Sequence, residues 1–160
     1  MGLVELHMHS CFSLMDALAS PEELVSRARE LGYESLALTD HGGLFGIPRF
    51  LRAAKSAGIK PVVGCEIYVS PTTRSDRSPD LRPVGHHLTL LAENPEGYKN
   101  LVALSSAGFS EGFFYRPRVD QELLAKHSKG LILLTGCIHS ALCEKLLADD
   151  RAAADKLIGV

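Results

Sequence analysis

The stretch KPVVGCEIYV, residues 60–69, is predicted to form a buried β-strand that carries one charged side chain. Short apolar runs bounded by turn residues are typical of strands that lie inside a sheet. Glu66 interrupts this run, and a lone buried carboxylate is costly unless it is paired or bound to a metal. A solvent-facing glutamate on an edge strand is the alternative. Cys65 faces the other way and is expected to be a small core residue.

Strands and helices alternate along the rest of the chain. Four further segments share the apolar character of residues 60–69. They are residues 3–8, 35–40, 86–92 and 131–136. This alternation indicates the α/β class with a parallel sheet and right-handed crossovers, either an open doubly wound sheet or a barrel. In both architectures, functional side chains gather at the carboxyl ends of the strands.

Capping residues and apolar spacing mark the helices between these strands. Ser20 and Glu23 form a capping box around Pro21 at the first helical position. Gly32 and Gly58 close the first and second helices. The first helix is expected to bury Leu24, Ala28 and Leu31, and the second carries an apolar stripe of Ile47, Phe50, Leu51 and Ala54. Later helices are predicted from about Pro95 through Leu104, after Asp120 as N-cap, over residues 140–148 and over residues 151–158.

The composition is that of one globular domain. With 160 residues, of which 46% are hydrophobic and 22% are charged, the chain can bury a sizeable core. We expect no transmembrane segment, no signal peptide and a cytoplasmic location. The cysteines form no C-x-x-C pair and should stay reduced. Because a closed barrel usually needs about 200 residues or more, residues 1–160 are expected to be a fragment forming one domain, with a mobile surface loop at 70–85.

Residue types that bind metals occur near the ends of the first two strands. His7 and His9 are two apart on a predicted strand, so their imidazoles leave the same face. That geometry suits two nitrogen ligands on one ion. After the second strand, His41 is the expected ligand, and Asp40 orients a neighbour or holds the loop. A turn or helix-cap carboxylate is the alternative for Asp40.

The later strands add further candidates. His86 and His87 open the fourth strand, where alternation allows only one inward imidazole, and Cys137 and His139 follow the fifth. Each is weak alone, but five strands together deliver histidine, glutamate or cysteine to one end of a sheet. So large a set indicates a multinuclear site, with Glu66 bridging ions about 3.5 to 4 Å apart. Phosphoester hydrolysis is the natural chemistry of such sites.

Two arginines extend this hypothesis to the substrate. Arg116 and Arg118 in FFYRPRVD can supply bidentate phosphate contacts, with exposed loop arginines as the alternative. The net charge near −2 argues against a domain that holds DNA by bulk positive charge. Any contact with nucleic acid is therefore expected to be local.

The motifs at the strand ends resemble those of a known family. They are HMHSCFS followed by Asp16, LTDHGGLFG, GCEIYV, HHLTLLAENPEGYKNL, FFYRPRVD and LTGCIHS. In this order they are similar to the PHP (polymerase and histidinol phosphatase) domain over essentially the whole chain. NPEGYKNL and YRPR resemble the branch at the N-terminus of bacterial DNA polymerase III alpha subunits and their error-prone paralogues, rather than the free-standing phosphatases.

The resemblance implies a PHP-type distorted (βα)7 TIM-like barrel, here truncated to about five βα units. It also implies a site for up to three Zn²⁺ or Mn²⁺ ions, with metal-bound hydroxide as the catalytic group and Mg²⁺ in the polymerase domain of the parent. The implied metal ligands are His7, His9, Asp16, His41, Glu66, His87 and Cys137. Family members complete the site with an Asp-x-His motif that this chain does not contain. His139 receives no role.

Three functions follow as hypotheses. The first is a metal-dependent phosphodiesterase that removes 3′-terminal nucleotides of DNA, which amounts to 3′ to 5′ exonuclease proofreading. The second is a metal-stabilised structural module that supports the polymerase and docks a proofreading partner. The third is a histidinol-phosphatase-type phosphomonoesterase. The parent implied by the resemblance is a DNA-directed DNA polymerase, a nucleotidyltransferase of replication or translesion synthesis. Its expected partners are DNA, its own polymerase domains, an exonuclease subunit and a sliding clamp.

Overall fold

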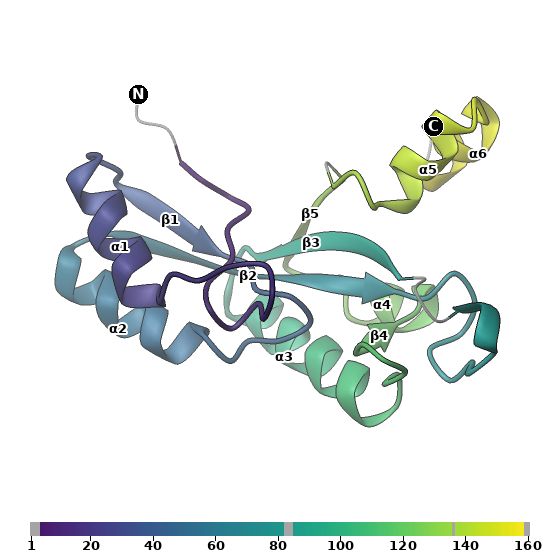
Figure 1. Ribbon diagram of the computed structural model, residues 1–160, viewed down its shortest axis with the longest axis horizontal. Helices are drawn as coiled ribbons and strands as arrows, with labels where there is room; N and C mark the ends of the chain where they lie inside the picture. The colour runs from purple at the N-terminus through teal and green to yellow at the C-terminus, as the bar shows by residue number, and fades with distance from the viewer. Residues whose placement is uncertain (1–3, 82–84, 136, 159–160) are drawn as a thin grey trace.

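Helices and strands alternate along the chain, which confirms the α/β class. Figure 1 shows the computed structural model, which describes residues 4–81, 85–135 and 137–158. Its elements are α1 (Pro21–Glu30), β1 (Ser35–Leu38), α2 (Ile47–Ala57), β2 (Lys60–Val69), η1 (Pro79–Leu81), β3 (His86–Ala92), α3 (Pro95–Ser110), β4 (Arg118–Val119), α4 (Gln121–Lys126), β5 (Leu131–Leu134), α5 (Ala141–Leu147) and α6 (Arg151–Ile158). Residue 3 of the first predicted strand, residues 82–84 of the predicted loop and residue 136 of the fifth predicted strand lie outside the described residues.

The strands form one mixed sheet in the order β1-β2-β3-β5, with β4 paired to β2. β1 and β4 lie parallel to β2, whereas β3 runs antiparallel to both β2 and β5. The predicted parallel sheet is therefore wrong for these two pairs. A parallel return usually passes through a crossover helix. The described part of the connection from β2 to β3 contains only the three-residue 3₁₀-helix η1, so β3 runs back along β2.

Of the strand predicted over residues 3–8, the described residues 4–8 form a single bridge, between Glu5 and Leu36. Side chains take the backbone donors that a longer ladder would use. The His7 amide donates to the Glu5 carboxylate at 3.2 Å, and the Met8 amide donates to Thr39 Oγ1 at 2.9 Å. This segment therefore follows β1 without continuing the sheet. Strand β4 was not predicted, because two residues are too few to show an alternating pattern.

The helix boundaries agree closely with the capping signals. Ser20 and Glu23 form the predicted capping box of α1, and Gly58 ends α2 in the left-handed conformation with φ of 71°. The burial pattern needs two corrections. Leu31 follows the last residue of α1 and is 53% exposed, while Val25 takes the buried place. Leu51 of α2, also expected in the apolar stripe, is 37% exposed.

Two apolar clusters flank the sheet. One joins α1, α2 and β1 through buried residues such as Val25, Leu36 and Phe50. The other joins β2, β3, α3 and α4 through residues such as Cys65, Leu90 and Leu104. In Figure 1, α1 and α2 lie together at one end of the sheet and α3 covers its middle. None of the described helices is long and apolar enough to cross a membrane.

The described part of the predicted loop at 70–85 is anchored to the rest of the domain. Arg74 donates from its backbone and its guanidinium to Asp120, and its Nε donates to Glu111 at 2.7 Å. Arg77 donates to the carbonyl of Glu111. The mobility of this loop remains a prediction.

Candidate metal centre

Glu66 lies at the centre of the candidate site because strand alternation turns it away from the core. Its neighbours Cys65 and Ile67 pack into the apolar cluster shared with α3 and α4. Glu66 is nevertheless only 2% exposed, and β2 is paired on both sides, which excludes an exposed residue on an edge strand. The carboxylate contacts three imidazoles, from His7, His9 and His87.

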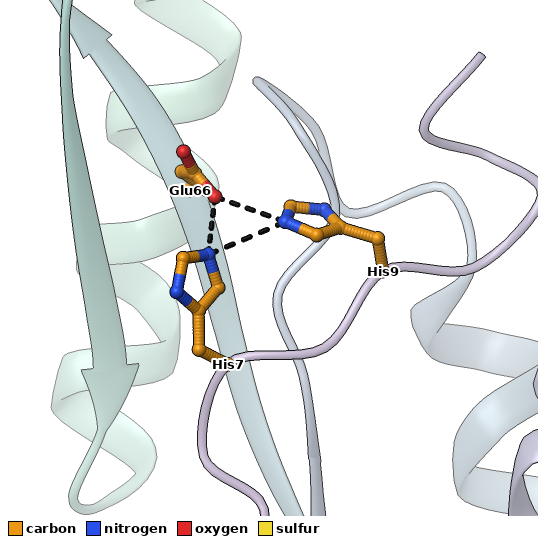
Figure 2. A group of neighbouring side chains, drawn as sticks. All are labelled: His7, His9 and Glu66. Carbon is orange, nitrogen blue, oxygen red and sulfur yellow. Dashed lines mark hydrogen bonds and ion pairs between the residues drawn. The ribbon is translucent and has the colours of Figure 1, made fainter. Parts of the chain in front are cut away.

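Two of these imidazoles come from the segment that precedes α1. Figure 2 shows His7 and His9 converging on Glu66 Oε2, with His9 Nε2 at 3.0 Å. The two Nε2 atoms are 3.3 Å apart. Two nitrogens at about 2.0 to 2.1 Å from a tetrahedral ion are themselves about 3.3 Å apart. The pair therefore has the spacing of two ligands on one metal.

His41 reaches the site because its backbone is paired with that of Glu66. The parallel bridge between them includes a hydrogen bond of 2.8 Å from the Gly42 amide to the Glu66 carbonyl. Paired residues point to the same side of a sheet, so the His41 ring lies beside the carboxylate. His41 Nδ1 is buried and lies 3.9 Å from Glu66 Oε1, and no described residue forms a hydrogen bond with it. An unpartnered ring nitrogen facing a carboxylate across this gap fits an ion between them.

Asp16 reaches the site from the loop that connects His9 to α1. A hydrogen bond of 2.8 Å from the Cys11 amide to the Ala19 carbonyl closes this loop. Asp16 Oδ2 lies 3.1 Å from His41 Nε2 and 4.0 Å from His9 Nε2. The side chain is about half exposed, so this part of the site is open to solvent.

The antiparallel direction of β3 brings His87 to the same place. His87 opens its strand and pairs with Tyr68 near the end of β2, so its Nδ1 lies 2.5 Å from Glu66 Oε1. His86 points elsewhere and lies 3.7 Å from Glu144, as alternation requires. Cys137 Sγ lies 3.7 Å from Glu66 Oε1.

The charges of the site are strongly coupled. Burial raises the pKa of Glu66, but hydrogen bonds from His87, His9 and His7 outweigh it and hold that pKa well below its usual range. Burial lowers the pKa of His9, but the Glu66 carboxylate outweighs this effect and raises it overall. For His41, burial prevails and the pKa is lowered, which favours a neutral ring with a free lone pair.

The donor atoms form three overlapping groups in which all ligand atoms lie within 4.8 Å of one another. They are His7, His9 and Glu66; His9, Asp16 and His41; and His41, Glu66 and His87. Imidazole and carboxylate donors, with the Cys137 sulfur at the edge, suit divalent zinc or manganese. The structure thus brings together all seven residues implied by the sequence motifs, and their arrangement fits divalent ions.

The two arginines proposed for phosphate binding differ sharply. Arg116 is exposed, lies over the Tyr68 ring at 4.9 Å and has Nη1 3.3 Å from His87 Nε2. Arg118 is only 1% exposed and donates to the carbonyls of Gly112 and Asp76. The phosphate contact predicted for Arg118 is therefore wrong, because no substrate can reach a side chain enclosed in this way.

Asp40 holds the loop that contains Ser10 and Ser13, which is one of the two roles predicted for it. Its carboxylate accepts hydrogen bonds from the Ser10 amide, the Ser10 hydroxyl and the Ser13 hydroxyl.

Two residues near the site, Ser13 and Tyr68, were not predicted from the sequence. Tyr68 stacks on His41 with ring centroids 5.6 Å apart, and its position two residues after Glu66 on one strand carried the signal. Ser13 lies in an irregular loop, where no periodicity applies.

Comparisons with known proteins agree with the motifs. A profile of the PHP domain family matches residues 5–159. The DNA polymerase III subunit alpha of Treponema pallidum is 46% identical over 98% of this chain, and that of Chlamydia muridarum is 43% identical over 99%. The chain spans 13% of the length of each relative.

Similarity to solved structures is weaker. An amidohydrolase from Chromobacterium violaceum is 28% identical over 65% of this chain and 32% of its own, with a TM-score of 0.49. A Bacteroides vulgatus protein containing a "predicted PHP-like metal-dependent phosphoesterase" is 19% identical over 86% of this chain and 36% of its own, also with a TM-score of 0.49. The family profile, by contrast, covers almost every residue of the chain. The chain belongs to the PHP domain family.

Proposed function

We propose that the chain is a metal-dependent phosphoesterase domain. The observation that carries this proposal is the convergence of four imidazoles on Glu66. This carboxylate is 2% exposed, and its ion-pair partners among the described residues are all histidines. The proposed ligands are His7, His9, Asp16, His41, Glu66, His87 and Cys137. Divalent ions in such a site activate water and neutralise the charge of a phosphate.

Glu66 is well placed to join neighbouring ions. Its Oε2 faces His7 and His9, and its Oε1 faces His87 and His41. One carboxylate oxygen is thus available to each of two subsites, which is the arrangement of a bridging ligand. Asp16 and His41 supply donors for a third subsite. Zn²⁺ and Mn²⁺ suit the nitrogen and oxygen donors, and the sulfur of Cys137 favours Zn²⁺.

Arg116 is the proposed phosphate contact. Its guanidinium lies beside His87 on the exposed side of the site, held over the Tyr68 ring. A planar guanidinium can bind two phosphate oxygens at once and orient the ester. Arg118, being buried, has no part in this proposal.

The relatives suggest the longer protein in which this domain acts. We propose a bacterial DNA polymerase III alpha subunit, in which the domain removes nucleotides from a DNA 3′ end in the cytoplasm. The support is identity of 43% to 46% with alpha subunits over nearly the whole chain. The corresponding partners are DNA, the polymerase domains of the same chain and, through them, an exonuclease subunit and a sliding clamp.

A structural role is the second candidate. The ligand residues come from five parts of the chain, which are the N-terminal segment, the loop after β1, β2, the start of β3 and the segment after β5. Bound ions would tie these five parts together. In that case metal binding would contribute to folding without hydrolysis. Loss of thermal stability on metal removal, in a protein without nuclease activity, would favour this candidate.

The test is metal content and hydrolysis in the full-length protein, with and without His9→Ala. We expect bound zinc or manganese and release of nucleotides from a 3′-labelled DNA strand, both strongly reduced by the substitution. The control is His127→Ala, because His127 bonds Asn100 and takes part in none of the three ligand groups. Metal binding without any hydrolysis would leave the structural role, and absence of metal from the wild type would refute both.

A further inference from the structure

Ser13 is a buried loop residue that touches two of the proposed ligands. It is 1% exposed, and its Oγ lies 3.0 Å from His9 Nδ1. The same oxygen accepts a hydrogen bond of 3.1 Å from the His41 amide and lies 2.7 Å from Asp40 Oδ1. A single hydroxyl therefore joins the carboxylate of Asp40 to both histidines.

The hydrogen-bond inventory of Ser13 decides which nitrogen of His9 carries a proton. A serine hydroxyl has one proton and two acceptor lone pairs. A carboxylate can only accept, so the Ser13 proton goes to Asp40 and one lone pair receives the His41 amide. Toward His9 the hydroxyl can then only accept. His9 Nδ1 must therefore be the protonated nitrogen, and Nε2 is the nitrogen left for a ligand bond.

We propose that Ser13 is a positioning residue that fixes His9 in the orientation and tautomer needed to bind a metal through Nε2. The inference rests on the proposed metal site and adds a residue that is not itself a proposed ligand and that acts on metal binding through the His9 ring. His9 Nε2 points at Glu66 Oε2 and lies 3.3 Å from His7 Nε2, so the fixed ring presents its free nitrogen to the shared position. The carboxylate of Asp40 makes the Ser13 oxygen a stronger acceptor, which raises the basicity of the His9 ring.

The chain offers a matched control for this proposal. Ser10 is also fully buried and donates its hydroxyl to Asp40 at 2.8 Å, but none of its described side-chain contacts is with His9. Ser10→Ala therefore removes a hydrogen bond to the same carboxylate from the same loop. A difference between Ser13→Ala and Ser10→Ala isolates the connection to His9.

The experiment is Zn²⁺ affinity by chelator competition in the full-length protein. Ser13→Ala should weaken Zn²⁺ binding by about 10- to 100-fold, the range found when a partner of a metal-binding histidine is lost. Ser10→Ala should weaken it by less than about threefold. In a His9→Ala background, Ser13→Ala should have no further effect, because it acts through that ring. The visible spectrum of the Co²⁺-loaded protein should change in Ser13→Ala and not in Ser10→Ala.

Two outcomes would overturn the proposal separately from the metal site. Equal losses in Ser13→Ala and Ser10→Ala would mean that loop packing, not the bond to His9, matters. If the losses of Zn²⁺ affinity caused by Ser13→Ala and His9→Ala added up in the double variant, Ser13 would not act through the His9 ring. If the wild type binds no Zn²⁺, the proposed function fails, and the role of Ser13 fails with it.

Discussion

Glu66 and Asp120 are both buried carboxylates, at 2% and 4% exposure, but their surroundings differ in kind. Asp120 follows β4 and caps α4, and it accepts hydrogen bonds from the amides of Arg74 and Leu123. The Arg74 guanidinium adds two more contacts, at 2.9 and 3.1 Å. Glu66 has no arginine or lysine among its described partners, and its neighbours are imidazoles.

The partners of a buried carboxylate, more than its burial, therefore indicate its role. Arginine keeps its proton at every accessible pH, so the Arg74–Asp120 pair is complete within the protein. Imidazoles can exchange a proton for a metal, and Nδ1 of His41 has no hydrogen-bond partner among the described residues. Asp120 therefore belongs to the framework, whereas the surroundings of Glu66 support its place in the proposed metal site.

The largest expected effect is that of Glu66→Gln on metal binding. Removing the charge while keeping the shape takes a donor from two of the three ligand groups at once. We expect Zn²⁺ affinity to fall by more than about 100-fold, beyond the effect of losing an outer partner. Chelator competition measures this, with Glu93→Gln, an exposed glutamate just after β3, as the control. Equal affinities for both variants would remove Glu66 from the site.

Asp120→Ala should instead act on stability. The substitution deletes the N-cap of α4 and leaves the Arg74 amide without its partner. Lost caps and unpaired buried donors predict a loss of about 1 to 3 kcal/mol in the free energy of unfolding. Denaturant unfolding measures it, and Zn²⁺ affinity should stay unchanged. A loss of metal binding as large as that of Glu66→Gln would erase the distinction between the two carboxylates.

Much of the fold was predictable because its signals are local. The strand over Lys60–Val69 and the strand over His86–Ala92 were predicted with the bounds that the structure has. Capping residues defined the helices for the same reason. Strand direction was not predictable in this way, because it depends on what connects two strands rather than on either strand. His86 and His87 contained a hint, since they open their strand whereas His41 and Cys137 follow theirs.

The convergence of the site was predictable where alternation applies. Glu66 and His87 lie on regular strands, so the face toward which each points follows from its position. Asp16 was placed by its family motif, because a loop has no period from which to infer a contact. The error at Arg118 has a similar origin. Two arginines separated by one proline look equivalent in sequence, and only tertiary packing encloses one and exposes the other.

Arg116→Ala sharpens the comparison from the substrate side. If Glu66 holds ions and Arg116 holds the phosphate, the substitution should raise KM for DNA by about tenfold while metal content stays constant. The physical reason is the loss of a two-oxygen contact beside His87. Steady-state hydrolysis kinetics measure it, with Arg27→Ala, an exposed arginine of α1, as the control. Unchanged kinetics would show that Arg116 does not contact the substrate.

The smallest expected effect is the pH dependence of the Asp120 contribution. Burial raises the pKa of Asp120, but hydrogen bonds from the Arg74 and Leu123 amides and the Arg74 guanidinium outweigh it and lower the pKa below its ordinary value of 3.8. A carboxyl whose pKa is lowered by folding stabilises the folded state above its unfolded pKa, and this stabilisation is lost as the pH falls through the folded pKa.

Asp120→Asn keeps an N-cap but not the charge, so the free energies of unfolding of wild type and variant should differ by less than about 1.5 kcal/mol at neutral pH. The gap should close as the pH falls below 3.8, because protonated aspartate then resembles asparagine. Denaturant unfolding of both proteins at each pH measures this gap. The titration of Glu66 and the histidines changes the free energy of unfolding equally in the two proteins, so it cancels in the difference. A gap that stays constant down to acid pH would mean that hydrogen-bond geometry, and not charge, accounts for the contribution of Asp120.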